Sequence, residues 1–416
     1  MCIRDSKNIY TEYNGTDGVL LNSLLNRFIY AVKFGSIELL VSSSITNQSK
    51  ILMNRNIHQR IKRIAPFLKY DSDPYIVTSN GRLYWIIDAY TTTSNYPYSE
   101  TVFLDGIGAI NYIRNSVKVV VDAYNGDVSY YIIDNDDPII KTYEKIFPGL
   151  FSNISEIPDG LRRHIRYPEG LFSIQAHIYG TYHMKDPQVF YNKEDVWVIP
   201  DEVYRANRQS MTPYYVIMKL PNRENEEFIL MIPFRPKAKE NMIGWMAARS
   251  DSPNYGDIIV YEFSKQELIY GPMQIEARID QNTEISQLLT LWNQAGSNVI
   301  RGNTLVIPIK NSILYIEPLY LQATQTGSLP ELKRIIVAYQ NQVVMRNTLQ
   351  QALEEIFGKT KPSPSQNKTQ ELLPEQVIEQ IDKLYTKAQQ ALTQGSLTEY
   401  ASYIEQIGVI LDDYEK

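Results

Sequence analysis

The sequence predicts an α+β protein with mainly antiparallel sheets from several hairpins, interspersed helices and a C-terminal helical hairpin. Two Asn-Gly dipeptides, at Asn80 and Asn125, lie between strand-like segments and favour the tight turns of β-hairpins. Other segments repeat their apolar residues at helical spacing. Because these helical segments interleave with the hairpins, we expect an α+β fold rather than a parallel α/β fold.

Composition is that of a globular protein. The chain has 416 residues, of which 44% are hydrophobic and 21% are charged, so it can bury a sizeable core. Its net charge is −6 and it contains no long Lys/Arg run, which argues against nucleic acid as a partner. Tyrosine is frequent, with 31 residues against 12 phenylalanines. Sheet faces and half-buried loops explain this, although a surface that grips a polymer or another protein is an alternative.

The chain begins without a recognisable targeting signal. The one cysteine, Cys2, lies in the segment MCIRDS, which has neither the apolar core nor the cleavage site of a signal peptide. We interpret residues 1–17 as a non-native or disordered start. No run of 18 or more apolar residues occurs, so we expect no membrane-spanning helix within this sequence.

Residues 18–200 are expected to form a first α+β region. Apolar residues at helical spacing predict a helix over Val19–Phe34, stopped by Gly35. A wide apolar stripe on that helix is expected to be partly exposed, because the preceding residues are too polar to cover it. Asp137 before Pro138 predicts the start of another helix. Further helices are expected near residues 57–68 and 169–183, and residues 186–212 look irregular.

Residues 201–357 are expected to form a second α+β region. A hairpin is predicted across Pro221, a helix over Asn241–Arg249, a strand over Met273–Ile279 and a helix over Thr283–Gln294. More strands are predicted up to residue 339, and a short helix over 348–357. The polar, proline-containing residues 358–373 are predicted to form a linker. Residues 374–416 are predicted to form a helical hairpin that docks onto the body or a partner.

Several segments resemble a known family. They include LLNRFIYAVKFGSIELLVSSSI, RNIHQRIKRIAPFLKYDSDPY, YHMKDPQVFYNKEDVW, MIGWMAARSDSPNYG and GPMQIEARIDQNTEISQLLTLWNQAGSNVIRGNTLVIPI. These are similar to the UPF0182 proteins, a family of uncharacterised bacterial membrane proteins. The resemblance implies transmembrane helices ahead of a large region outside the cytoplasm. We therefore expect a truncated sequence whose membrane contact ran through missing N-terminal helices. The resemblance implies no reaction and no cofactor.

A polar cluster near the middle of the chain supplies most candidate site residues. These are His183, Asp186, Tyr191, Asn192, Glu194, Asp195 and Trp197. His177 and His183 are six residues apart, which is not the spacing of a helical zinc pair, so no metal site is assigned. The structural interpretation is a loop whose acids cap helices and whose Tyr191 and Trp197 anchor it to the core. A calcium site and a binding groove are the alternatives.

Two further acidic clusters have structural and functional interpretations. Asp134–Asp137 reads as a turn with a helix N-cap, or as a calcium site. Glu276, Arg278 and Asp280 fall on one face of the presumed strand at 273–279. Such alternation is typical of a solvated sheet face, although two carboxylates so placed could flank a sugar bond. No hydrolase elbow, P-loop or metalloprotease motif occurs, so no residue is assigned as catalytic.

The preferred functional hypothesis is an extracytoplasmic binding or scaffolding domain of a membrane protein, contacting an envelope protein or polymer. The rival is a cell-envelope enzyme, for example a hydrolase, with a site near His183–Trp197. A deep pocket with convergent acids and a buried histidine would favour the enzyme, and a groove lined by aromatic residues would favour the binding domain.

Overall fold

The computed structural model describes residues 13–104, 107–205, 207–221, 223–264, 266, 268–294, 296–309, 312–325, 327–358, 382–390 and 403. By its internal contacts the chain divides into residues 1–356 and 357–416. Most of the predicted start, linker and C-terminal hairpin lies outside the described residues. Residues 382–390 are helical and fall within that predicted hairpin. The other expected domain boundaries stay predictions.

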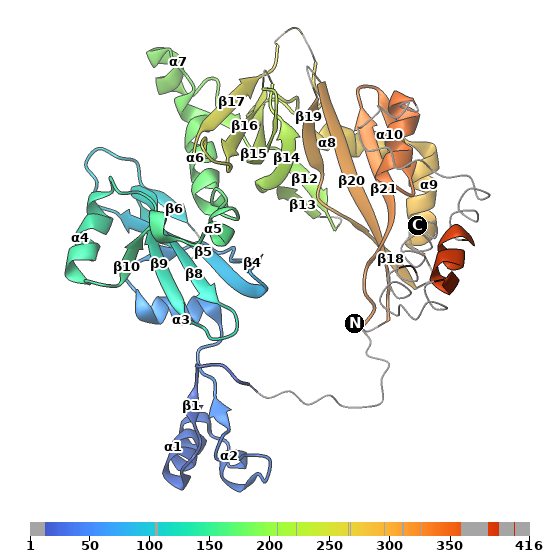
Figure 1. Cartoon of the computed structure of the whole chain (residues 1–416). Helices are drawn as coiled ribbons and strands as arrows, with labels where there is room; N and C mark the ends of the chain where they lie inside the picture. Colours follow the sequence, from blue (N-terminus) through green and yellow to red (C-terminus); the bar gives the residue numbers. More distant parts are fainter. Residues whose placement is uncertain are drawn as a thin grey trace. The chain divides into compact units, whose positions relative to one another are not determined.

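The first sheet contains both Asn-Gly hairpins. Its order is β10-β9-β8-β5-β3, with β4 also paired to β5, and all its pairs except β10–β9 are antiparallel (Figure 1). The strands are β3 (Lys69–Tyr70), β4 (Tyr75–Ser79), β5 (Arg82–Thr93), β8 (Tyr112–Asp122), β9 (Val128–Ile132) and β10 (Phe151–Asn153). The two hairpins are joined edge to edge through β5 and β8. The predicted hairpins are confirmed.

Helices cover both faces of this first sheet. Helices α3 (Ile57–Ile64) and α4 (Pro138–Ile146) bury Ile61 and Ile140 against Val119 and its neighbours. The short helix α5 (Asp159–Arg162) packs on the opposite face, where Val120 points. Successive strand residues point to opposite faces, so β8 contributes valines to both layers. Helix α4 begins as predicted, because the Asp137 side chain caps it.

The second sheet corrects one prediction. It consists of β11 (Trp197–Val198), β14 (Tyr214–Lys219), β15 (Glu226–Pro236), β16 (Gly244–Arg249) and β17 (Ile258–Glu262), in the order β11-β15-β16-β17, with β14 also on β15. The helix predicted over Asn241–Arg249 is wrong, because β16 is a central strand with all six residues buried. A strand buried on both faces loses the alternation that would reveal it. Helix α6 (Glu169–Tyr182) packs on one face and confirms the predicted helix.

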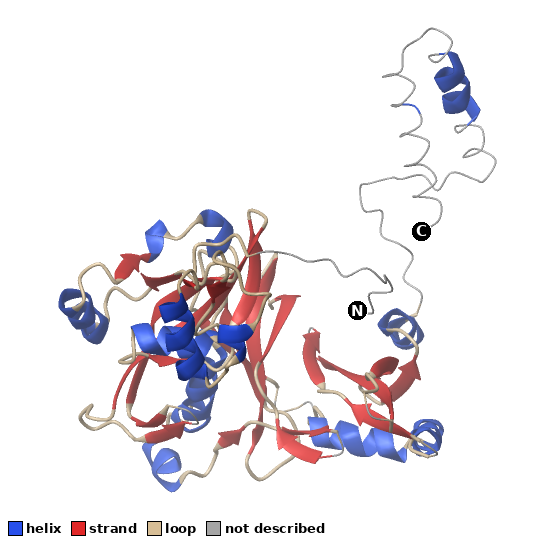
Figure 2. Ribbon diagram, turned by 90° about the horizontal axis from the view of Figure 1, so that it is seen from below, coloured by secondary structure: helices blue, strands red, loops and turns tan. Residues whose placement is uncertain are grey.

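The third sheet is covered by helices on both faces. Its strands are β18 (Ser297–Arg301), β19 (Leu305–Ile309), β20 (Ser312–Ala323), β21 (Glu331–Tyr339) and β22 (Gln342–Arg346), in the order β18-β20-β21-β22, with β19 also on β20. Helices α8 (Pro272–Gln281) and α9 (Thr283–Trp292) pack on one face, and α10 (Leu349–Phe357) on the other. Figure 2 shows strands in red and the helices against them in blue.

Helix α8 replaces the strand predicted over Met273–Ile279. The alternation of polar and apolar residues there suggested a strand, but Ile275 and Ile279 are also one helical turn apart and both are buried. Pro272 occupies the first turn and the Gln274 side chain accepts from the Gly271 N–H, which starts the helix. Helix α9 confirms the helix predicted over Thr283–Gln294.

The remaining elements are short apart from α1, which has 11 residues. They are β1 (Val19–Leu20), α1 (Leu24–Phe34), α2 (Glu38–Val41), β2 (Lys50–Ile51), β6 (Val102–Leu104), β7 (Gly108–Ile110), η1 (Ile154–Glu156), α7 (Pro187–Asn192), β12 (Asp201–Tyr204) and β13 (Asn207–Ser210). Helix α1 starts later than predicted, because Val19 and Leu20 pair with β2. Its predicted stop at Gly35 is confirmed by a φ of 64°. The stretch 186–212 is more regular than predicted, since α7 and β11–β13 lie there. Among the described residues, no helix is long and apolar enough to cross a bilayer.

Candidate functional site

Four aromatic side chains cluster where α6 meets the edge of the second sheet. His183, directly after α6, stacks on Trp197 of β11 with ring centroids 4.0 Å apart and planes 28° apart. Tyr179 lies edge-on to Trp197 at 6.1 Å, and Phe234 of β15 is 5.9 Å from the same indole. The indole is only 5% exposed and the His183 side chain 7%. His183 and Trp197 were both predicted as site residues, and the structure places them in contact.

A close approach of helix to strand creates this cluster. A Cβ atom on Gly180 of α6 would lie 2.4 Å from the Trp197 carbonyl oxygen, so only glycine permits the contact. Trp197 is held in register by pairing with Pro236 of β15. The backbone N–H of His183 donates to the Tyr179 carbonyl at 3.0 Å and ends the helix beside the indole.

A hollow of about 250 Å³ opens next to the indole. We call it the Trp197 hollow, and it lies between α6, β11 and the strands beside them. It is lined by Ala176, His177, Thr181, Val196, Trp197, Val198, Ile199, Ser210 and Phe234. The lining is mostly apolar, with two hydroxyls and one imidazole and no carboxylate. This is the composition of a binding pocket with few polar groups, and it lacks the paired acids of a glycosidase.

Two buried nitrogens in the aromatic cluster have no hydrogen-bond partner among the residues that the structure describes. They are Nε1 of Trp197 and Nε2 of His183. His183 Nδ1 lies 3.2 Å from the Tyr179 carbonyl, which leaves Nε2 to find another partner. The nearest carboxylate oxygen, on Asp195, is 3.8 Å away, too far for a hydrogen bond. A buried unsatisfied N–H costs about 1–3 kcal/mol, so the Trp197 indole is a donor in need of an acceptor.

The other candidates from this segment do not converge on the hollow. Asp186 caps α7 by accepting from the backbone N–H groups of Gln188 and Val189 at 2.8 and 3.1 Å. Asn192 donates to Glu194 at 2.8 Å on the surface. Tyr191 is 86% exposed, so the interpretation that it anchors the segment to the core is wrong. Of the two predicted anchors, only Trp197 is buried.

Glu276 and Asp280 belong to a second cluster, around Arg301. They lie one turn apart on α8, and the Arg301 guanidinium from β18 contacts both, with 2.9 Å from Nη1 to Oδ1 of Asp280. Glu317 of β20 accepts from Nε and Nη2 of the same arginine at 2.5 and 3.0 Å. Three carboxylates therefore share one guanidinium. The predicted solvated sheet face is wrong for Glu276, because α8 turns it inward, whereas the Asp280 side chain is 62% exposed.

Two of the three carboxyl groups in the Arg301 cluster are buried. Glu276 and Glu317 are each 2% exposed in their side chains. Burial and then the charge of Glu317 raise the pKa of Glu276 to about 8, and burial raises the pKa of Glu317 as well. Glu276 also accepts a hydrogen bond from the Thr304 hydroxyl at 3.0 Å, so the hydrogen-bond partners given for its carboxyl group are protein side chains. The Arg301 cluster joins α8 to the third sheet, and the carboxyl group of Glu276 is mostly protonated at neutral pH.

Arg278 points away from that cluster. Its guanidinium donates to the carbonyls of Gln340 and Asn341, both at 2.6 Å, at the β21–β22 turn. Arg301 and Glu317 were not predicted as site residues, because they are distant in sequence from α8. The available signal was a charged residue, Glu317, inside an otherwise apolar strand.

A buried lysine was also missed. Lys118 of β8 is fully buried and forms an ion pair with Asp88, its partner across β5. Its Nζ also donates to the Arg166 carbonyl at 2.8 Å and lies 5.4 Å from the centre of the Tyr255 ring. All its neighbours are protein groups, so we interpret Lys118 as a structural contact between the first sheet and the loop before β17.

The acidic run at 134–137 is a helix start. Asp137 is buried and accepts from the hydroxyls of Ser116, Thr91 and Tyr112 and from the Ile139 N–H. Asp134 forms an ion pair with Arg114 at 3.1 Å. These contacts are those of the predicted N-cap. No group of three or more His, Cys, Asp or Glu suited to a metal ion occurs within the described ranges.

Comparison with known proteins identifies relatives. Residues 3–292 match the model of an uncharacterised protein family, UPF0182. The chain is 59% identical over 414 residues to a UPF0182 protein of Methanospirillum hungatei, covering 98% of this chain and 46% of the relative. It is 49% identical over 433 residues to one of Trichodesmium erythraeum, covering 99% and 47%. The chain thus spans about half the length of these curated relatives. No solved structure matches it.

Proposed function

The chain belongs to the UPF0182 family, and on that premise we propose that it is an extracytoplasmic binding domain of a membrane protein, with the Trp197 hollow as its ligand site. The observation that carries the proposal is the buried indole N–H of Trp197, which has no acceptor among the described residues and belongs to a side chain that lines an open hollow. A ligand oxygen would supply that acceptor. The membrane attachment and the location outside the cytoplasm rest on the family resemblance alone.

The chemistry of the lining favours a secondary amide as the bound group. An amide offers a carbonyl oxygen to the indole N–H and a methyl or methylene group to Phe234 and Ile199. The hydroxyls of Thr181 and Ser210 are able to accept its N–H. Peptides and N-acetylated sugars both carry this group, and both fit the notion of an envelope protein or polymer as partner.

The rival hypothesis of an envelope hydrolase has less support. A hydrolytic site needs a positioned acid or base beside the bound group. His183 is buried as that hypothesis required, but the Trp197 hollow has no carboxylate in its lining, and Asp195 is 54% exposed on its side chain. An aromatic hollow without convergent acids favours binding over bond cleavage.

Calorimetric titration of the 416-residue chain with N-acetylglucosamine trisaccharide and, separately, with trialanine tests the proposal. We expect saturable binding of at least one of the two, weakened about tenfold by Trp197→Phe because the donor is lost. The matched control is Trp245→Phe, the same truncation at another buried indole, 2% exposed in the second sheet. Equal weakening by both variants, or no binding of either probe, would contradict the proposal.

A further inference from the structure

The largest group of exposed apolar side chains in one short segment lies on α1 and α2. We call it the α1–α2 face. Its members and their exposed fractions are Leu24 76%, Leu25 67%, Phe28 56%, Ile29 50%, Val32 67%, Ile37 71% and Val41 72%. Soluble monomers rarely expose so many large apolar side chains side by side, so such a face indicates an interaction surface.

The face has the geometry of an amphipathic helix. At about 100° per residue, the five residues of α1 that belong to the face lie within an arc of about 140° with no polar residue among them. The buried Ala31 lies outside this arc. The face is therefore a continuous apolar strip on the outside of the helix rather than a scatter of single side chains.

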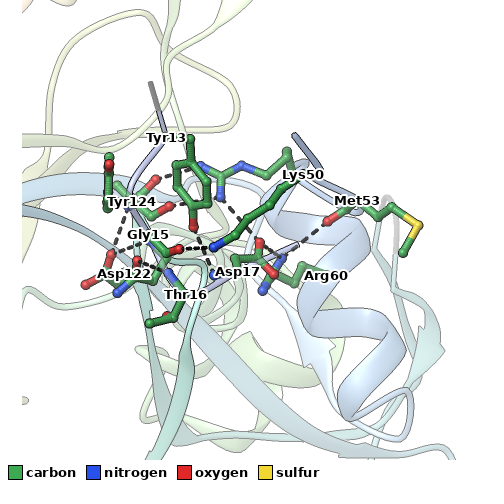
Figure 3. A network of polar contacts seen from close by, with 12 residues as sticks. Tyr13, Gly15, Thr16, Asp17, Lys50, Met53, Arg60, Asp122 and Tyr124 are labelled. Carbon is green, nitrogen blue, oxygen red and sulfur yellow. Dashed lines mark hydrogen bonds and ion pairs between the residues drawn. The ribbon is translucent and has the colours of Figure 1, made fainter. Parts of the chain in front are cut away.

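A polar network holds the base of this region in place (Figure 3). Strands β1 and β2 pair, and the Lys50 Nζ donates to the Gly15 carbonyl at 2.6 Å. Arg60 of α3 forms an ion pair with Asp17 at 3.3 Å. Arg55 donates to the carbonyls of Ala123 and Tyr124 at 2.8 and 3.2 Å, in the turn after β8. The α1–α2 face thus belongs to an ordered segment that is tied to the first sheet.

The same segment carries the opposite charge to the chain as a whole. Residues 13–64 contain seven Lys/Arg against two Asp/Glu, a net charge of +5, whereas the full chain has −6. Lys33, Lys62 and Arg63 are exposed, and none forms an ion pair with a described residue. Arg63 lines one hollow together with Val19, in the strand that leads into α1, and with the ion-paired Asp17 and Arg60.

We propose that the α1–α2 face docks into the headgroup layer of an anionic lipid bilayer, with Lys33, Lys62 and Arg63 at the level of the phosphates. An exposed apolar helix face on a segment of net positive charge is complementary to such a layer, which supplies an apolar interior beneath negative headgroups. The proposal concerns a surface separate from the Trp197 hollow and does not depend on ligand binding there.

Cosedimentation of the 416-residue chain with lipid vesicles tests this docking. One vesicle is phosphatidylcholine alone and the other contains about one third phosphatidylglycerol. We expect the chain to bind the anionic vesicles, and we expect added salt to weaken binding because it screens the lysines and arginines. The triple variant Leu25→Ser, Phe28→Ser and Val32→Ser should lose binding about tenfold or more, because three inserted apolar side chains are removed.

The matched control replaces three equally exposed leucines elsewhere, Leu268, Leu291 and Leu329, with serine. This control should bind like the unmodified chain, and circular dichroism should show all three proteins folded. Equal binding to both vesicle types, an unaffected α1 variant, or no binding to anionic vesicles would each overturn the proposal. A further outcome would also overturn it: the unmodified chain does not bind vesicles but forms a dimer, seen by light scattering, and the α1 variant is monomeric. The face would then be a contact between two copies of the chain.

Discussion

Replacing Arg301 with methionine should destabilise the protein in a pH-dependent way. Methionine keeps most of the length of the side chain but removes the cation that Glu276 and Glu317 share. Removing one partner of a buried ion pair typically costs about 3–5 kcal/mol, because the remaining charge has no compensation. We expect a loss of that size at about pH 8, where the two carboxyls must either bind protons from a solution that holds few or remain buried and charged.

The sign of the pH dependence follows from Glu276. Its pKa in the folded protein is raised from 4.5 to about 8, so the folded state holds a proton that the unfolded chain releases. Stability therefore falls as pH rises from about 4.5 to about 8, by up to about 1.4 kcal/mol per unit for each extra proton held. Without Arg301 both carboxyls hold their protons more firmly, so this fall becomes steeper. Near pH 5 the variant should lose only about half as much.

Urea denaturation at about pH 5 and about pH 8 measures the free energy of unfolding that Arg301→Met loses at each pH. The control is Arg278→Met, the same change on α8. The Arg278 guanidinium donates to two backbone carbonyls and lies 4.9 Å from the centre of the Tyr270 ring, so the change removes no partner of a carboxylate and should cost about 1 kcal/mol at either pH. Adding Glu317→Gln to Arg301→Met should recover part of the loss at pH 8. The reasoning is refuted if Arg301→Met costs under about 1 kcal/mol, or costs the same at both pH values.

Three other substitutions test local parts of the structure. Asp137→Ala should cost about 2–4 kcal/mol by thermal or urea unfolding, because it removes the cap of α4 and three buried acceptor contacts. Burial alone would raise the pKa of Asp137, but hydrogen bonds led by those from the Ser116 and Thr91 hydroxyls outweigh burial and hold the pKa below 3.8. The stability that Asp137 contributes should therefore be present above pH 4 and be lost in stronger acid. Gly180→Ala should cost about 1–3 kcal/mol and shift the near-ultraviolet signal of Trp197, since its Cβ meets the Trp197 carbonyl at 2.4 Å. Gly35→Ala should cost about 1 kcal/mol, because φ is 64° in open space, and an unchanged melting temperature would contradict that estimate.

Local signals explain which elements could be predicted. The Asn-Gly turns and the Asp-Pro start of α4 act through neighbouring backbone, so the sequence alone sufficed for β4–β5, β8–β9 and α4. Strand β16 was mistaken for a helix because burial on both faces removed its alternation. Residues 273–279 fit a strand and a helix equally well by periodicity, and the Gly271-Pro272 start that decides between them was overlooked.

The candidate sites were predictable only in part, for a related reason. His183 and Trp197 could be named because they lie close together in sequence. The Trp197 hollow is also lined by Phe234 and Ser210. Strand pairing in the second sheet positions Phe234, and the β12–β13 hairpin positions Ser210. Arg301 reaches Glu276 only through the packing of α8 on the third sheet. Contacts between distant segments leave no periodic trace, so sequence patterns do not reveal them.

The most direct measurement of the binding proposal is the nuclear magnetic resonance signal of the Trp197 indole N–H. With the four tryptophans labelled with ¹⁵N, Trp197→Phe assigns its signal. The account predicts that saturating N-acetylglucosamine trisaccharide or trialanine moves this signal downfield, as a donor that gains an acceptor should, while the Trp245 signal stays in place. Unchanged Trp197 and Trp245 signals with both probes, or equal movement of all four, would contradict it.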